Sequence, residues 1–434
     1  MQFYSTNKSA ANVSLKQAVL KGLADDKGLY MPERIDSMPS DFFKNISELT
    51  FSETAFAVAK KFFGEDIPDD KLKNIIDQTL SFDCPLREVR ADIYSLELFH
   101  GPTLAFKDVG ARFMARLLEY FLGDNDKEVN VLVATSGDTG SAVANGFLGV
   151  PGIHVYVLYP KGKVSKIQEK QFTTLGKNIT SLEVDGNFDD CQRLVKSAFM
   201  DEQLQSSLIL TSANSINVAR FLPQTFYFFD AYRQLKTAGL DKKLVISVPS
   251  GNFGNLTAGL FAKRMGLPVK RFIAANNEND VVYEYLQTGK YNPRASVQTI
   301  ANAMDVGDPS NFVRILDLYD HSWKSICADL SGVRYSDDEI RATIKEVYAK
   351  DKYILDPHGA TGCKSLIDGL KPGETGVFLE TAHPAKFMST VEPLVGKGNI
   401  PVPDRLSKFM EGTKVSIPLS KEFKDFKKFL MNKN

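Results

Sequence analysis

The residue of this sequence best placed for chemistry is a lysine in a turn-rich loop. Lys107 lies near the end of the stretch HGPTLAFKD, after Gly101, Pro102 and Thr103, and apolar residues follow it at helical spacing. A lysine in the first turn of a helix lies beside the positive end of the helix dipole, which favours the neutral amine. A neutral amine is the group that forms a Schiff base with a carbonyl cofactor. Because a merely solvated lysine needs no such sharply turning loop, the sequence predicts a reactive Lys107.

Two further loops combine glycine with small polar residues between a strand pattern and a helix pattern. Ser250–Asn255, with the sequence SGNFGN, would expose backbone amides at a helix start, which suits a phosphate dianion. It lacks both the Gly-Lys-Ser/Thr of a nucleotide P-loop and the spacing of a dinucleotide loop. Thr135–Gly140, with the sequence TSGDTG, has the residues of an anion-binding nest, although an ordinary helix cap explains them equally well.

Two polar stretches are weaker candidates for a second phosphate site. Lys161 and Lys163 follow a strand pattern in YPKGKVS, and Ser215 and Arg220 lie at a helix start in SANSINVAR. A solvated basic loop and an ordinary capped helix account for these residues at least as well. Both interpretations stay open from the residues alone.

Seven motifs in order along nearly the whole chain resemble the threonine synthase family, pyridoxal-phosphate (PLP) enzymes of the tryptophan-synthase-β fold type. The motifs are HGPTLAFKD, TSGDTG, YPKGKVS, TSANSIN, SVPSGNFGN, NAMDV and TAHPAKF. The resemblance implies that Lys107 is the catalytic lysine, which carries the cofactor and removes the Cα proton of the substrate.

The resemblance also implies the other contacts of the site. The residues implied for the cofactor, besides Lys107, are Gly251, Asn252, Phe253, Gly254 and Asn255 at the phosphate and Thr381 at the pyridine nitrogen. The residues implied for the substrate carboxylate are Thr135, Ser136, Gly137, Asp138 and Thr139. Asp138 stands where many relatives of this fold type carry Asn, a feature that resembles the threonine synthase subgroup. For His383 we expect helix capping or packing.

Strand and helix patterns predict an α/β protein. From Asp92 onward, apolar β-rich runs alternate with helical patterns, which is typical of βαβ units around a parallel sheet. The runs are Ile93–Phe99, Val129–Ala134, Ile153–Tyr159, Ile179–Val184, Leu208–Thr211, Leu244–Val248, Val269–Ala275 and Thr375–Glu380. We also expect one long helix at Ile216–Leu235 and an amphipathic helix with a tail after Asp404. With the resemblance, this predicts two open, mostly parallel-sheet domains of PLP fold type II at 91–215 and 216–434, with the chain crossing between them. A small, mainly helical domain at 1–90 precedes them.

Composition excludes several classes of protein. Lys+Arg and Asp+Glu both number 53, so no global field attracts nucleic acid or an anionic membrane. The four cysteines show no CxxC pair and the five histidines no HExxH-like cluster, so we expect neither disulfides nor a metal site. No apolar run approaches membrane length and the N-terminus lacks a secretory pattern, so we expect a cytoplasmic protein. The oligomeric state stays open, with a monomer among the possibilities.

The resemblance implies a reaction as well as a fold. O-phospho-L-homoserine and water would give L-threonine and phosphate, the last step of threonine biosynthesis. The alternative is a PLP-dependent dehydratase or β-replacement enzyme acting on serine- or threonine-like amino acids, which would share the fold and Lys107. Only the first function requires a site for a substrate phosphate, for which the candidates are Lys161, Lys163, Ser215 and Arg220.

Overall fold

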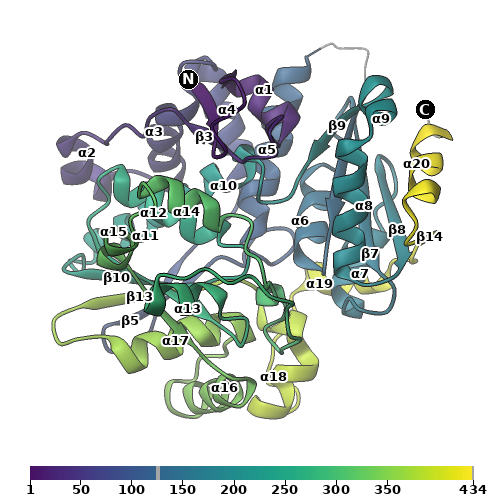
Figure 1. Ribbon diagram of the computed structural model, residues 1–434. Coiled ribbons are helices and arrows are strands. Elements are labelled where there is room, and N and C mark those ends of the chain that lie inside the picture. The colour runs from purple at the N-terminus through teal and green to yellow at the C-terminus, as the bar shows by residue number, and fades with distance from the viewer. Residues whose placement is uncertain (124–127, 433–434) are drawn as a thin grey trace.

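Three sheets organise the computed structural model, which describes residues 1–123 and 128–432 (Figure 1). Near the N-terminus, β1 (Gln2–Ser5) pairs antiparallel with β2 (Val13–Ser14) and β3 (Tyr30–Pro32). The other two sheets, named here the β10 sheet and the β7 sheet, have the orders β12-β11-β10-β13-β5-β4 and β14-β8-β7-β6-β9. Their strands are β4 (Leu86–Arg90), β5 (Ile93–Glu97), β6 (Val129–Ala134), β7 (Ile153–Pro160), β8 (Ile179–Asp185), β9 (Ile209–Ser212), β10 (Leu244–Pro249), β11 (Val269–Asn276), β12 (Leu330–Arg334), β13 (Thr375–Glu380) and β14 (Ile417–Ser420).

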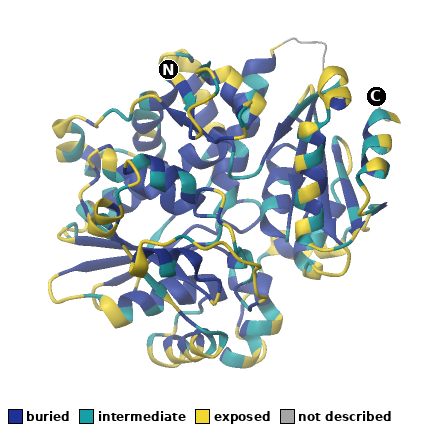
Figure 2. Ribbon diagram, viewed as in Figure 1, coloured by how far each residue is buried: buried dark blue, intermediate teal, exposed yellow. Residues whose placement is uncertain are grey.

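Both larger sheets are parallel except at one edge, where β4 runs antiparallel to β5. Helices cover the sheets, so central strands such as β6 and β10 are buried along their whole length (Figure 2). Strands buried on both faces read as continuous apolar runs, as VNVLVA and LVISVP do. The predicted α/β class with mostly parallel sheets is confirmed.

Helices fill the connections between strands. Their bounds are α1 (Leu15–Lys21), α2 (Ser40–Asn45), α3 (Phe51–Phe63), α4 (Asp69–Thr79), α5 (Lys107–Leu122), α6 (Asp138–Gly146), α7 (Lys166–Thr173), α8 (Phe188–Met200), α9 (Glu202–Ser207), α10 (Val218–Phe221), α11 (Thr225–Thr237), α12 (Gly254–Arg264), α13 (Val281–Thr288), α14 (Phe312–Leu318), α15 (Trp323–Asp329), α16 (Asp337–Asp351), α17 (Pro357–Gly369), α18 (Met388–Val395), α19 (Asp404–Glu411) and α20 (Phe423–Asn432). Short 3₁₀ helices lie at Ile46–Glu48, Leu222–Gln224, Asn302–Met304 and Pro384–Phe387.

The chain passes repeatedly between the two larger sheets. It builds β4 and β5 in the β10 sheet, moves to the β7 sheet for β6 to β9, and returns for β10 to β13. The last strand, β14, pairs with β8 and so closes the edge of the β7 sheet with C-terminal residues. The domain boundaries at residues 90 and 215 stay a prediction.

The structure differs from the sequence prediction in four places. The edge strands β4 and β12 of the β10 sheet were not predicted. The expected helix at Ile216–Leu235 is broken into α10, a 3₁₀ turn and α11, because Pro223 lacks the N–H that a continuous helix requires. The region of residues 1–90 also contains β1, β2 and β3, whose runs are too short for a clear alternation. The expected C-terminal helix with a tail is α19 followed by β14 and α20.

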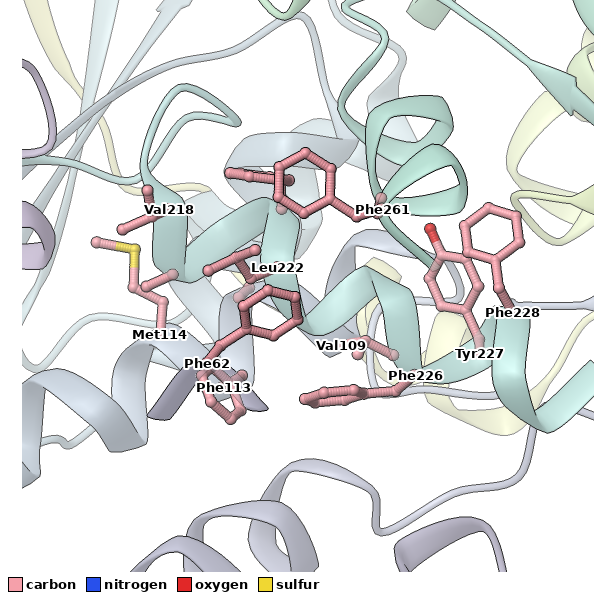
Figure 3. Close-up of a cluster of buried hydrophobic side chains, with 14 of the residues drawn as sticks. Phe62, Val109, Phe113, Met114, Val218, Leu222, Phe226, Tyr227, Phe228 and Phe261 are labelled. Carbon is pink, nitrogen blue, oxygen red and sulfur yellow. The ribbon is translucent and has the colours of Figure 1, made fainter. Parts of the chain in front are cut away.

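A cluster of large apolar side chains joins the helices that carry the polar site (Figure 3). Val109, Phe113 and Met114 of α5 pack toward Val218 of α10 and Phe226 of α11. The rings of Phe113 and Phe226 meet edge to face with centroids 5.7 Å apart. Because interiors are densely packed, this cluster fixes the start of α5 relative to α10 and α12.

Candidate active site

A cavity collects the loops that follow β5, β10 and β13, the expected place for a ligand in an open α/β sheet. The residues that line it are Phe106, Lys107, Thr139, Asn214, Ser215, Arg220, Gln224, Pro249, Gly251, Asn252, Phe253, Gly254, Asn255, Ala303, Met304, His358 and Thr381. The cavity therefore brings the predicted lysine together with the SGNFGN loop and with Thr381.

Lys107 is the first residue of α5 and its amine is enclosed within the site. Burial lowers the pKa of Lys107 to about 8; the carboxylate of Asp138 opposes this shift, and the cations of Lys386 and Arg220 add to it. No other described residue forms a hydrogen bond or ion pair with this amine. The site thus holds an amine that is partly neutral near physiological pH and free to react.

The loop before Lys107 is held by its own polar groups. Asp108 accepts hydrogen bonds from the Thr103 amide (2.9 Å) and the Thr103 hydroxyl (2.6 Å). Gly101 faces this carboxylate so closely that a Cβ there would lie 2.4 Å from Asp108 Oδ2. The Phe106 amide donates to the Thr381 carbonyl at 2.9 Å, which ties the lysine loop to the loop after β13. Glycine at 101 is therefore required by the close approach of the Asp108 side chain.

Ser250–Asn255 forms a turn, named here the cradle, between β10 and α12. The backbone amides of residues 251–255 have no hydrogen-bond partner within the described chain, so they are available to an anion at a helix start. Phe253 adopts a left-handed conformation (φ 61°) that turns the chain into the helix. A Cβ at Gly251 would lie 2.6 Å from the Ala303 carbonyl oxygen, so only glycine fits there.

In the TSGDTG loop between β6 and α6, some of the backbone amides are already hydrogen-bonded within the loop. The Thr135 hydroxyl oxygen accepts from the amides of Gly137 (2.9 Å) and Gly140 (2.8 Å). Thr135 is buried, Ser136 is half-buried, and Thr139 reaches the cavity. Two of the amides that the sequence suggests for an anion nest are thus already occupied.

A buried ion pair lies between this loop and the lysine. Lys386 Nζ lies 2.6 Å from Asp138 Oδ1 and donates to the Thr103 carbonyl at 2.9 Å. Gln168 Nε2 donates to the same Asp138 oxygen at 2.9 Å. Burial alone would raise the pKa of Asp138, but the cations of Lys386 and Lys107 hold it well below its usual range. Asp138 is therefore a stable carboxylate beside the reactive amine.

Of the four residues predicted to bind a second phosphate, two line the cavity and two do not. Ser215 and Arg220 line the cavity. Arg220 is buried, donates to the Ala213 carbonyl and leaves its Nε without a partner within the described residues. Burial lowers the pKa of Arg220 to about 10, so it remains a cation. Lys161 and Lys163 are exposed after β7 and do not line the cavity, and their assignment stays a prediction.

Comparison with known proteins covers the whole chain. Residues 2–80 match the family described as threonine synthase N terminus, residues 79–380 match pyridoxal-phosphate dependent enzyme, and residues 359–430 match threonine synthase, C-terminal. The threonine synthase of Serratia marcescens is 44% identical over 432 residues, which cover 99% of both chains. The chain belongs to the threonine synthase family.

Solved structures of the threonine synthase family agree with this chain in fold. The crystal structure of threonine synthase from Escherichia coli has a TM-score of 0.93 at 43% identity, over 100% of both chains. The PLP-bound threonine synthase from Brucella melitensis has a TM-score of 0.93 at 35% identity, covering 100% of this chain and 99% of that one. This threonine synthase family member is thus a PLP-dependent enzyme of fold type II.

The cavity fits the cofactor of the threonine synthase family. It offers an amine without a partner in Lys107 and unpaired backbone amides in the cradle at residues 251–255. Thr381 also lines the cavity. The described residues contain no group of three or more His, Cys, Asp or Glu that could hold a metal ion. None of the described helices is long and apolar enough to cross a membrane.

Two residues of this threonine synthase family site were not predicted from the sequence. Lys386 lies five residues after Thr381 in TAHPAKF, and only the three-dimensional fold brings it to Asp138. His358 bonds through Nδ1 to Asp356 Oδ1 (2.5 Å), and its Nε2 accepts the Ala303 amide (3.1 Å). An accepting Nε2 places the proton on Nδ1, so His358 holds the loop at Ala303 against the cradle. His383 caps the following turn through the Ala385 amide (3.1 Å), as expected.

Proposed function

We propose that this chain catalyses the conversion of O-phospho-L-homoserine and water into L-threonine and phosphate, as the last step of threonine biosynthesis. One observation carries the proposal: an enclosed, unpartnered lysine amine and a set of unpaired cradle amides face one cavity. The match of the whole chain to threonine synthases supports this choice over other PLP enzymes.

The proposed role of Lys107 follows from its free amine. PLP, when bound, withdraws electrons from the Cα of an attached amino acid and stabilises negative charge there. Lys107 would hold the cofactor through Nζ and, once released by the substrate amine, accept the Cα proton on that same atom. In the overall reaction a proton leaves Cβ, the Cγ–O bond breaks and phosphate leaves. A proton is then added at Cγ, and water adds its hydroxyl to Cβ and releases its remaining proton. Lys107 Nζ finally returns a proton to Cα.

The proposed anion contacts divide among three parts of the cavity. Gly251, Asn252, Phe253, Gly254 and Asn255 would hold the cofactor phosphate through their amides, and Thr381 would offer its hydroxyl to the pyridine nitrogen. The residues proposed for the substrate carboxylate are Thr135, Ser136, Gly137, Asp138 and Thr139, chiefly through the amides that remain free. Ser215 and Arg220, with Lys161 and Lys163, are proposed for the substrate phosphate.

The charge of the neighbouring residues supports this division. The cations of Lys107, Lys386 and Arg220 lie near one another, and two carboxylates, those of Asp138 and Asp108, lie among them. A surplus of buried cation favours a substrate that carries a dianion. Arg220, with an unpartnered Nε at the cavity, is the strongest of the candidates for the substrate phosphate.

A substrate comparison tests the proposal. Turnover of phosphohomoserine is expected, and homoserine should be inert because it lacks both the leaving group and the anion that pairs with the buried donors. Arg220→Met should raise KM for phosphohomoserine while cofactor absorbance is retained. Efficient deamination of serine or threonine, with phosphohomoserine ignored, would favour the dehydratase alternative.

We also infer a cytoplasmic location, while a monomer stays one of the possible assembly states. Among the described residues, Cys84, Cys191 and Cys363 are buried free thiols and Cys327 is an exposed one. Unpaired thiols are typical of a reducing compartment. We expect the substrate to be the small molecule alone, with no nucleic acid bound.

A further inference from the structure

Arg314, near the start of α14, is the largest of the fully buried side chains that the structure describes. Its guanidinium donates to the Tyr30 carbonyl through Nε (3.2 Å) and Nη2 (3.1 Å). It also donates to the carbonyls of Ser215 (3.1 Å) and Ile216 (2.5 Å) and to Asn311 Oδ1 (2.5 Å). Every acceptor is neutral, and no carboxylate of the described chain forms an ion pair with this arginine.

Such a charge is unusual in a protein interior. Buried charges are generally paired with an opposite charge, because removing an ion from water is costly. The Phe221 ring, whose centroid lies 4.2 Å from the guanidinium carbon, offers only a weak attraction. Burial lowers the pKa of Arg314 to about 9, which leaves it protonated at neutral pH. The protein therefore keeps a positive charge here that its own residues do not neutralise.

The partners of Arg314 connect it to the cradle. Asn311, held by the guanidinium, donates from its side chain to the Asn252 carbonyl (3.0 Å) and to the Ser215 hydroxyl (3.0 Å). The Asn311 amide donates to the same Asn252 carbonyl at 3.2 Å. A Cβ at Gly254 would lie 3.2 Å from Ser215 Cβ, so Ser215 forms a wall of the cradle. Figure 1 shows α14 beside α12, the helix that the cradle opens.

We propose that Arg314 is a positioning residue of the cradle and the fixed cation that makes the cradle select a phosphate dianion. It holds Asn311 and Ser215 against the loop, and its uncompensated charge is connected to Asn252 of that loop through the Asn311 side chain. The inference rests on the proposed assignment of those residues to the cofactor phosphate. A cation that is fixed and dehydrated attracts an anion more strongly than a solvated one.

The test compares the affinities of the apoenzyme for PLP and for pyridoxal, which lacks the phosphate. In Arg314→Met the ratio of the PLP affinity to the pyridoxal affinity should fall at least tenfold, with pyridoxal affinity changed less than twofold. Arg314→Lys, which keeps the charge and loses the planar fork, should give an intermediate ratio. If the affinities for PLP and pyridoxal fall together in Arg314→Met, so that their ratio is unchanged, Arg314 has a purely structural role and the inference is overturned.

Two controls keep the test decisive. Arg112 also donates to backbone carbonyls, including that of Thr79 at 3.0 Å, but does not line the cavity. Arg112→Met should therefore leave the affinity ratio unchanged. If Arg314→Met does not fold, Arg314→Lys and Asn311→Ala carry the test, and a wild-type ratio in both would contradict the proposal. The wild-type protein reports separately on the cradle: no preference for PLP over pyridoxal would refute the cradle assignment itself.

Discussion

The loops after β6 and β10 have the same layout, a buried parallel strand followed by a glycine-containing turn and a helix. They differ in charge, because the loop after β10 presents unpaired N–H donors and the loop after β6 carries a carboxylate. The cradle at residues 251–255 leaves its amides unpaired and is supported by the cation of Arg314. In the TSGDTG loop, two backbone amides donate to the Thr135 hydroxyl oxygen. This loop also carries a carboxylate, Asp138, which forms an ion pair with Lys386. The first loop leaves free N–H donors at a helix start, whereas the second contributes a negative charge to the site.

This difference shows that a strand–loop–helix motif does not by itself determine what the loop binds. The local sequence sets the turn and its glycines, but the charges come from residues far away in the chain. Lys386 reaches Asp138 from about 250 residues away in sequence, and Arg314 acts on the cradle through Asn311.

Removing the partner of Asp138 should have the largest effect on stability. Lys386→Met leaves a buried carboxylate unpaired, and breaking such a pair costs about 3–5 kcal/mol of unfolding free energy. Urea unfolding of the apoenzyme measures the loss. The double variant Lys386→Met with Asp138→Asn should recover most of it, since neither charge then remains. As a control, Lys364→Met breaks the more exposed pair with Asp368 on α17 and should cost at most about 1 kcal/mol. Equal losses in the two single variants would contradict a special role for the buried pair.

Adding a methyl group to each loop in turn should show which loop binds PLP and which binds the substrate. In Gly251→Ala the new Cβ meets the Ala303 carbonyl, and overpacking of this kind costs about 1–3 kcal/mol, which corresponds to about a 5- to 150-fold loss of PLP affinity. In Gly137→Ala the Cβ meets Gln168, and the KM for phosphohomoserine should rise while PLP affinity stays near wild type. Gly369→Ala, where a Cβ meets no described atom within 4 Å, is the control. PLP affinity lost equally in the variants at 137 and 251 would mean that the loops do not divide the ligands.

The smallest expected effect is a shift in pH dependence. Because burial lowers the pKa of Lys107 to about 8, the neutral amine increases as the pH rises through that value. The rate at which the apoenzyme captures PLP, followed by absorbance, should rise with a midpoint near pH 8. Asp138 raises the pKa of Lys107, so the midpoint in Asp138→Asn should move to lower pH. A midpoint that moves to higher pH would show that the carboxylate does not act on this amine.

Much of the fold and part of the site could be predicted from the sequence. Continuous apolar runs such as VNVLVA marked buried strands, and the glycine-rich turns after them marked the cavity. The long helix at Ile216–Leu235 was wrong because Pro223 interrupts a pattern whose apolar spacing continues across it. The strands β12 and β14 were missed because short edge strands carry little periodicity.

The rest of the site could not be predicted because it depends on contacts between distant segments. Nothing in TAHPAKF indicates that Lys386 lies fully buried against Asp138. The pairing of His358 with Ala303 likewise joins segments that follow no common motif. Lys161 and Lys163 illustrate the opposite case: a basic loop after a strand looks suitable in sequence, but both side chains are exposed in the structure.

We expect the cofactor to be carried by Lys107 and not by the neighbouring, fully buried Lys386. Lys386 lies in the same cluster, so the two amines can be compared in one experiment. The holoenzyme is reduced with borohydride, which fixes the link between lysine and cofactor, and digested for peptide mass spectrometry. The account predicts the cofactor mass on the peptide that contains Lys107, and its loss in Lys107→Ala. Labelling of Lys386, or no label on the wild-type protein, would contradict the account.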